Sequence, residues 1–234
     1  MADLELIELY PSPFSERVRW VLELKGLPYR RTQFVPLAGE AEHMSRTGIA
    51  TAPVLLADGE VVGDSNEALD WVEARHPATP LLPEDPVARA QVRAWEHLAT
   101  EVITPLARLG FIGKAKALGL QPLGDHFAAK YHWSKAEEAR GDRILRTVLP
   151  ELARAVEKTP YLVGNALTRA DVTMASMLIP VIGAPSNDLF VLDDPMRAMF
   201  GIPIGQESAL QPLHRWRDET YRRHRGGQVT PAAA

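Results

Sequence analysis

The chain contains no cysteine among its 234 residues. A protein without cysteine forms no disulfide, no thiolate metal site and no catalytic thiolate of its own. Redox proteins that act through their own cysteines are therefore excluded. An excess of one charge is also lacking, since the net charge is only −4. We therefore expect neither nucleic acid nor an anionic membrane as a partner.

Long apolar runs are missing as well. No stretch of the sequence is apolar enough to span a bilayer. The first residues, Met-Ala-Asp-Leu-Glu, lack the basic start and apolar core of a signal peptide. The seven histidines do not follow the spacing of metal ligands, so we expect no metal site. The composition, 46% hydrophobic and 24% charged, is typical of a soluble globular protein, and we expect it to be cytoplasmic.

A proline-rich segment divides the chain. Residues 76–86 read His-Pro-Ala-Thr-Pro-Leu-Leu-Pro-Glu-Asp-Pro. Each proline fixes φ and removes an amide donor, and it disfavours helix at the residue before it. Such a segment is typical of an extended linker between domains. We therefore expect one domain at residues 1–76, a linker at 77–86 and a second domain at 87–234.

Strand and helix signals alternate before the linker. The predicted strands are short apolar runs, and the predicted helices repeat apolar residues every three to four positions. Ala57-Asp58-Gly59 is a hairpin signal between two of the strands. In order, we expect a strand at 4–9, a helix at 13–25, strands at 29–35, 54–56 and 60–62, and a helix at 64–75. With a less regular stretch at 36–50, this order predicts a thioredoxin-like topology.

After the linker the patterns are helical. The segment 171–182 is apolar nearly all round, which predicts a buried central helix. Residues 110–135 and 183–209 show no clear pattern. The other expected helices lie at 87–109, at 136–157 with an interruption at Pro150, and at 210–224. The fold class is therefore an α+β, thioredoxin-like N-terminal domain followed by an all-α C-terminal domain.

Ser12 follows the first predicted strand and precedes Pro13, a residue favoured at the start of a helix. One interpretation is an N-cap whose side-chain oxygen bonds a backbone amide. The other is a hydroxyl at the positive end of a helix dipole, which donates a hydrogen bond to a bound thiolate. Each unit by which a thiol pKa is lowered corresponds to about 1.4 kcal/mol of thiolate stabilisation. Tyr10 and Ser15 are alternative donors, ranked after Ser12 in that order.

Two further segments carry candidate binding residues. Pro53 opens a strand without an amide donor, so it lies either at an edge with a trans bond or after a cis bond. In the second case Ala52 offers its amide and carbonyl to an extended peptide. Asp64 begins Asp-x-x-Glu, which resembles a capping box with Glu67. Beyond capping, Ser65 and the helix amides can bind a carboxylate, and Asp64 can pair with an amino group.

The start of the predicted buried helix has a purely structural interpretation. Thr168 is placed as its N-cap and Asp171 at the third helical position, which predicts a capping box. Leu167 and Val172 are placed to form a hydrophobic staple across this start.

Several of these segments resemble the cytosolic glutathione transferase superfamily. Residues 12–29, Ser-Pro-Phe-Ser-Glu-Arg-Val-Arg-Trp-Val-Leu-Glu-Leu-Lys-Gly-Leu-Pro-Tyr, resemble the first helix of its serine-type members, above all the plant tau pattern and more loosely zeta and omega. Ala52-Pro53 is similar to the residue and cis-proline that hold the cysteinyl backbone of glutathione. Asp64-Ser65 is similar to the pair that holds its γ-glutamyl end. Leu-Val-Gly-Asn at 162–165, followed by Thr168-x-x-Asp171, resembles the folding signature of the second domain.

The sequence departs from individual classes at three places. Omega-type proteins have cysteine where this chain has Ser12, which argues against thiol-transferase chemistry. The zeta isomerase motif has cysteine where this chain has Phe14, which argues against isomerase activity. Residues 36–50 lack a lysine for the glycine carboxylate of glutathione. His43 and Arg46 are the candidates to replace it.

The resemblance implies a transferase that takes glutathione as co-substrate. It would ionise the thiol beside Ser12 and direct it at a small electrophile, a reaction typical of detoxification. The electrophile would contact Phe14 and side chains from 87–131, and the candidates are Phe111, Arg108 and Tyr131. Members of the family are typically dimers, so a homodimer is expected. The alternatives are a non-catalytic binding or regulatory protein on the same fold, and a glutathione-dependent isomerase or dehalogenase.

Overall fold

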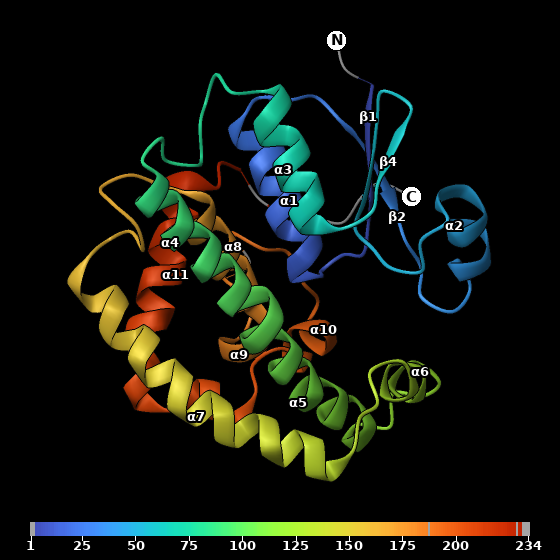
Figure 1. The fold of residues 1–234 in the computed structure, drawn as a ribbon. Coiled ribbons are helices and arrows are strands. Elements are labelled where there is room, and N and C mark those ends of the chain that lie inside the picture. Colours follow the sequence, from blue (N-terminus) through green and yellow to red (C-terminus); the bar gives the residue numbers. More distant parts are fainter. Residues whose placement is uncertain (1–2, 187, 228, 231–234) are drawn as a thin grey trace. The chain divides into compact units, whose positions relative to one another are not determined.

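The computed structural model describes residues 3–186, 188–227 and 229–230. The chain forms two compact units (Figure 1). Of the described residues, the first unit comprises 3–83 together with Thr230, and the second comprises 84–186, 188–227 and Val229. Asn187, in a stretch without a clear sequence pattern, lies outside the described residues, as do Met1, Ala2, Gln228 and the Ala-rich end at 231–234.

The first unit is built on a four-stranded sheet in the order β2-β1-β3-β4. Strand β1 runs parallel to β2 and antiparallel to β3, which is in turn antiparallel to β4. Helices α1 and α3 lie side by side along one face of this sheet, and α2 lies on its other side (Figure 1). The elements in chain order are β1 Leu4–Glu8, α1 Pro13–Leu24, β2 Arg30–Gln33, α2 Glu40–Thr47, β3 Val54–Ala57, β4 Glu60–Val62 and α3 Ser65–Arg75. The expected thioredoxin-like fold is confirmed.

Side chains of β1 alternate between the two faces of the sheet. Leu6 and Glu8 face α1, where Glu8 forms an ion pair with Arg19. Glu5 faces α2, where it forms an ion pair with Arg46. All five residues of β1 are buried, so even its carboxylates lie in the interior and each needs a cationic partner.

Helices α1 and α3 form as the apolar periodicity predicts. Val18 and Val21 of α1 are fully buried, as are Leu69 and Val72 of α3. Burying a side chain of this size contributes about 1.5–3 kcal/mol, so the helices are held mainly by this packing. The predicted hairpin is also confirmed, and Gly59 in its turn has a φ of 86°, which favours glycine.

Helix α2 corrects the sequence analysis, which expected a less regular stretch at 36–50. The helix spans Glu40–Thr47 and ends at Gly48, whose φ is 72°. Only His43 and Thr47 among its residues are buried. A helix of eight residues with two buried side chains lacks the apolar repeat from which helices are predicted.

The second unit is helical throughout its described residues, apart from connecting turns and one isolated bridge between Phe190 and Val229. Every residue of α8 and α9 is buried, which confirms that the core lies in the predicted central segment. The helices are α4 Pro86–His97, α5 Thr104–Ala117, α6 Leu123–Lys130, α7 Lys135–Lys158, α8 Arg169–Met177, α9 Ile179–Ile182, α10 Asp194–Met199 and α11 Gln211–His224. A π-helical turn, Leu98–Ile103, joins α4 to α5, and short 3₁₀ turns span Pro203–Gln206 and Ser208–Leu210.

Three proline positions explain where these helices differ from expectation. The segment predicted at 87–109 continues through the π turn and α5 to Ala117, and Pro105 lies in the first turn of α5. Pro150 does not interrupt α7. A mid-helix proline costs about 3 kcal/mol, and burial of neighbours such as Leu149 and Leu152 offsets this cost. The predicted buried helix is split: α8 ends at Met177, and α9 begins at Ile179 with Pro180 in its first turn.

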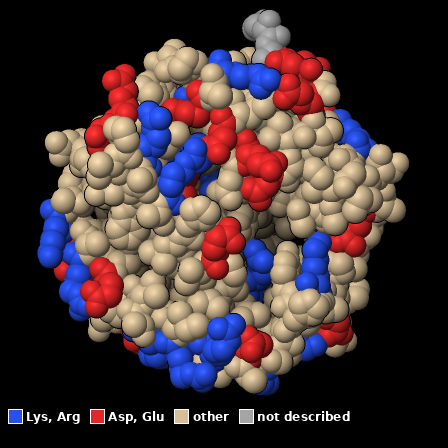
Figure 2. Space-filling model, viewed as in Figure 1, with Lys and Arg blue, Asp and Glu red and all other residues tan. Residues whose placement is uncertain are grey.

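The described residues lack two features that would indicate a membrane or a metal ion as a partner. None of their helices combines the length and apolarity needed to cross a membrane. They contain no group of three or more His, Cys, Asp and Glu side chains arranged to hold a metal ion. On the face shown in Figure 2, basic and acidic side chains are interspersed.

Candidate functional site

The start of α1 holds Ser12 in the N-cap position. The Ser12 amide donates to the Leu9 carbonyl at 2.7 Å, and the Ser12 carbonyl accepts from the Glu16 amide at 2.9 Å. The half-buried side chain makes no capping hydrogen bond within the described residues. The backbone of Ser12 therefore begins the helix without help from its hydroxyl. That hydroxyl can interact with a ligand at the positive end of the helix dipole.

The two alternative donors have different surroundings. Tyr10 is half-buried, and its ring centre lies 5.5 Å from the Arg19 guanidinium carbon. Ser15 is fully buried, and its oxygen accepts from the Leu9 amide at 3.1 Å. Ser15 thus has a role in joining β1 to α1.

A buried ion cluster lies behind this helix start, and the sequence analysis missed it. Arg19 is 1% exposed and pairs with Glu8 and with Glu16. Glu8 also accepts from Arg31. Burial alone would lower the pKa of Arg19, but the charges of Glu16 and Glu8 outweigh it and raise that pKa. The cluster keeps a cation fixed beside the Tyr10 ring.

The bond between Ala52 and Pro53 is cis, as the resemblance implies. The Ala52 side chain packs against a small core formed by Ile7, Phe34 and Val54. Its main-chain amide and carbonyl make no hydrogen bond to any residue that the structure describes. The main chain in front of β3 can therefore hydrogen-bond an extended ligand.

Asp64 caps α3, and its carboxylate accepts from the Asn66 amide at 2.6 Å. The expected capping box with Glu67 is not seen among the described residues, because Asp64 accepts from the second helical amide and Glu67 is exposed. Ser65 is buried, and its oxygen accepts from Arg17 Nη2 at 2.7 Å. Because its oxygen is the acceptor in this bond, the Ser65 hydroxyl keeps its own hydrogen to donate to an anion.

Arg17 is a site residue that the sequence analysis did not identify. It is fully buried, and its Nη2 also donates to Asn66 Oδ1 at 2.8 Å. Its partner Ser65 lies 48 residues further along the chain. Local periodicity carries no information on such a contact, so no signal in the sequence could have found it.

His43 and Arg46, the candidate partners of the glycine carboxylate, both bond residues of the first unit. His43 is 5% exposed, and its Nε2 lies 3.0 Å from the Thr51 carbonyl oxygen. Arg46 donates to Glu5 at 2.6 Å. The Arg46 hydrogen bond, opposed by burial and aided by Arg30, lowers the pKa of Glu5 to about 2. The side chains of His43 and Arg46 are thus both bonded within the first unit.

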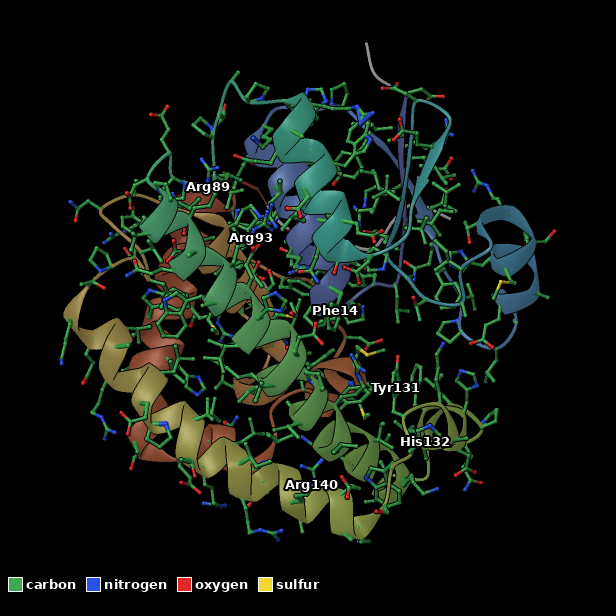
Figure 3. All side chains as sticks on the ribbon, viewed as in Figure 1. Phe14, Arg89, Arg93, Tyr131, His132 and Arg140 are labelled. Atoms are coloured by element: carbon green, nitrogen blue, oxygen red, sulfur yellow. The ribbon has the colours of Figure 1, made fainter. Side chains whose placement is uncertain are left out.

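The residues expected to contact the electrophile are half-buried. Phe14 lies on the first turn of α1, and Tyr131 directly follows α6 (Figure 3). Within the second unit, the Arg108 guanidinium lies 4.1 Å from the Tyr131 ring centre, and the Phe111 ring lies 5.5 Å from that of Phe200. Burial lowers the pKa of Arg108.

The sheet register brings the candidate residues of the first unit together. Ile7 pairs with Val54, so the last residues of β1 and the first residues of β3 lie at the same end of the sheet. Ser12 follows the end of β1, and Pro53 directly precedes the start of β3. The bond from Arg17 to Ser65 joins α1 to the start of α3. A hydroxyl, an unpaired main chain and a helix N-terminus therefore gather at one end of this unit.

Comparisons with known proteins agree with this geometry. The family model described as glutathione S-transferase, N-terminal domain, matches residues 11–75. A probable maleylacetoacetate isomerase from Caenorhabditis elegans is 29% identical over 74% of this chain and 76% of its own. Glutathione S-transferase U6 from Arabidopsis thaliana is 30% identical over 49% of this chain, and the match spans half the length of that relative.

A solved structure extends the likeness in fold to the whole chain. The glutathione S-transferase from Methylobacterium radiotolerans, in complex with glutathione sulfonate, aligns with 99% of this chain and 98% of its own. The TM-score is 0.66 at 22% sequence identity, so this match supports the fold alone. The chain therefore resembles glutathione S-transferases in sequence over residues 11–75 and shares their fold over its whole length.

Proposed function

We propose that the protein is a glutathione transferase that binds glutathione on its first unit and activates the thiol. One observation carries this proposal. Ser12, the unpaired main chain of Ala52 and the start of α3 gather at one end of a single unit. They supply what a thiol, a peptide backbone and a carboxylate each need.

Each part of glutathione has a partner in this proposal. The γ-glutamyl carboxylate accepts from the Ser65 hydroxyl and the amides of α3, with the Arg17 cation behind them. Asp64, exposed at this helix start, pairs with the amino group. The amide and carbonyl of Ala52 bind the cysteinyl backbone as an added strand.

The thiol then lies beside Ser12. A free thiol has a pKa of about 8.5, so most of it is protonated at neutral pH. A hydroxyl donor and the α1 dipole favour the thiolate and lower that pKa by about one to two units. Tyr10 is the alternative donor. The thiolate attacks a small electrophile, for which we propose contacts with Phe111, Tyr131 and Arg108. We further propose that the protein is a cytoplasmic homodimer.

Capture on immobilised glutathione, combined with conjugation of a chlorodinitrobenzene, tests the proposal. We expect retention, elution by free glutathione and formation of the thioether product. Retention without turnover would favour the alternative of a binding or regulatory protein. Loss of both would contradict the proposed function.

A glutathione-dependent isomerase is the second candidate, because three curated relatives are named maleylacetoacetate isomerase, one of them as probable. The zeta isomerase motif has cysteine at the position of Phe14, and the lack of this cysteine argues against isomerase activity. Mass spectrometry of the products separates the two reactions. A conjugate retains the glutathione, whereas the product of an isomerase does not contain it.

A further inference from the structure

The ring of His43 attaches helix α2 to the rest of the first unit. Only His43 and Thr47 are buried among the residues of this helix. The His43 ring packs against Phe34 with centroids 4.8 Å apart, and its Nε2 lies 3.0 Å from the Thr51 oxygen. A carbonyl oxygen accepts hydrogen bonds and cannot donate them, so Nε2 carries the proton. Nδ1 is buried and has no partner among the described residues, so the ring makes this one hydrogen bond.

The Thr51 carbonyl and the Ala52 amide belong to the same peptide group. The bond between Thr51 and Ala52 is not among the cis bonds of the described chain. In a planar trans peptide the C=O and N–H vectors point in opposite directions. A hydrogen bond that fixes the direction of the Thr51 oxygen therefore also fixes the direction of the Ala52 N–H. That amide has no partner within the described residues.

We propose that His43 is a positioning residue for glutathione, which acts by holding the Thr51–Ala52 peptide plane so that the Ala52 amide faces the cysteinyl backbone. This proposal rests on the proposed function of the first unit. His43 does not touch the ligand in this arrangement, and so it replaces the earlier expectation of a direct contact with the glycine carboxylate. Its effect is on binding of the peptide backbone and leaves the chemistry of the thiol unchanged.

The matched variants are His43→Gln and His43→Met, which have side chains of nearly equal length. Glutamine can place an amide N–H near the position of Nε2, whereas methionine cannot donate. Loss of one neutral hydrogen bond corresponds to about a five- to ten-fold change in affinity. We expect H43M to raise the Kd for S-methylglutathione and the KM for glutathione by about this factor. The kcat at saturating glutathione and the pH profile of the thiol should stay as in the wild type.

H43Q should restore binding to within about two-fold of the wild type, because it can remake the bond to Thr51. Glu42→Gln is the control on the same helix, since this exposed side chain is not bonded to the Thr51 carbonyl. We expect its Kd to match that of the wild type. Equal losses in H43Q and H43M, or wild-type binding by H43M, would overturn the proposal.

Nuclear magnetic resonance of the unliganded protein tests the positioning step without glutathione. The Ala52 amide signal should move and exchange faster with solvent in H43M, and it should keep its wild-type position in H43Q. Long-range nitrogen correlations in the wild type should show the proton of His43 on Nε2, which needs no variant to fold. A proton on Nδ1 alone, or an Ala52 signal that is the same in H43M, would refute the role of His43. Failure of the wild type to bind S-methylglutathione would instead refute the proposed function.

Discussion

Helices α1 and α8 begin in different ways, although the sequence predicts an N-cap hydroxyl for each. At α8 the Asp171 carboxylate accepts from the Thr168 amide at 2.8 Å, from the Thr168 hydroxyl at 3.0 Å and from the Leu162 amide at 2.7 Å. The predicted capping box is present. At α1 the Ser12 hydroxyl makes no capping bond within the described residues. The same position therefore serves folding in one helix, while in the other it leaves a donor for chemistry.

The difference extends to the surroundings of the two starts. Thr168 and Asp171 are both buried in a helix without an exposed residue. Burial raises the pKa of Asp171, against the opposing effect of the Leu162 and Thr168 amides. Ser12 is only half-buried and follows the end of β1 in the first unit. Variants of the two starts should consequently separate stability from activity.

The largest effect is expected from Asp171→Ala. It leaves two amides and a hydroxyl without an acceptor in a buried place, which should lower the free energy of unfolding by about 3–5 kcal/mol. Urea denaturation followed by circular dichroism measures this change. Asp171→Asn keeps the shape and one acceptor oxygen, so its loss should be smaller. A loss in D171A below about 1 kcal/mol would mean that the box is not what holds this helix start.

Ser12→Ala should have the opposite effect, with little loss of stability and a large loss of activity. Because no capping bond is lost, the free energy of unfolding should change by less than about 0.5 kcal/mol, compared with about 1 kcal/mol for an ordinary N-cap. Loss of a thiolate donor should raise the thiol pKa by about one to two units and lower kcat/KM near neutral pH by about ten- to a hundred-fold. Conjugation rates measured from pH 5.5 to 9 test both expectations.

Two neighbouring variants control this result. Ser15→Ala removes the acceptor of the buried Leu9 amide and should cost about 1–2 kcal/mol of stability while the pH profile stays in place. Tyr10→Phe tests the alternative donor. A shifted profile in Y10F together with an unchanged profile in S12A would transfer the role of thiol activation from Ser12 to Tyr10.

The comparison also shows how far the sequence predicts this protein. Local rules predict the strand before Ser12, the Ala57–Gly59 hairpin, the Asp64 cap and the Thr168 box, because their partners lie within a few residues. The helix α2 was missed because its sequence lacks an apolar repeat. Arg17 was missed because its partner Ser65 is distant in sequence. His43 was singled out, but its bond to Thr51 depends on the folded path between them.

The smallest expected effect concerns Glu5 of β1, which forms ion pairs with the exposed Arg30 of β2 and Arg46 of α2. The pKa of Glu5 is about 2, below its ordinary value of 4.5, so its contribution to stability is present above pH 4.5 and disappears as the pH falls towards 2. Arg30 and Arg46 are 62% and 42% exposed, and solvent screening limits the contribution to about 1 kcal/mol. Denaturation at pH 6 and pH 3, in low and high salt, measures it against Glu5→Gln, which should flatten the difference between the two pH values. If E5Q kept the full pH dependence of the wild type, the acid-sensitive contact would lie elsewhere. The attachment of α2 would then owe little to Glu5, which makes this measurement a direct complement to the H43M variant.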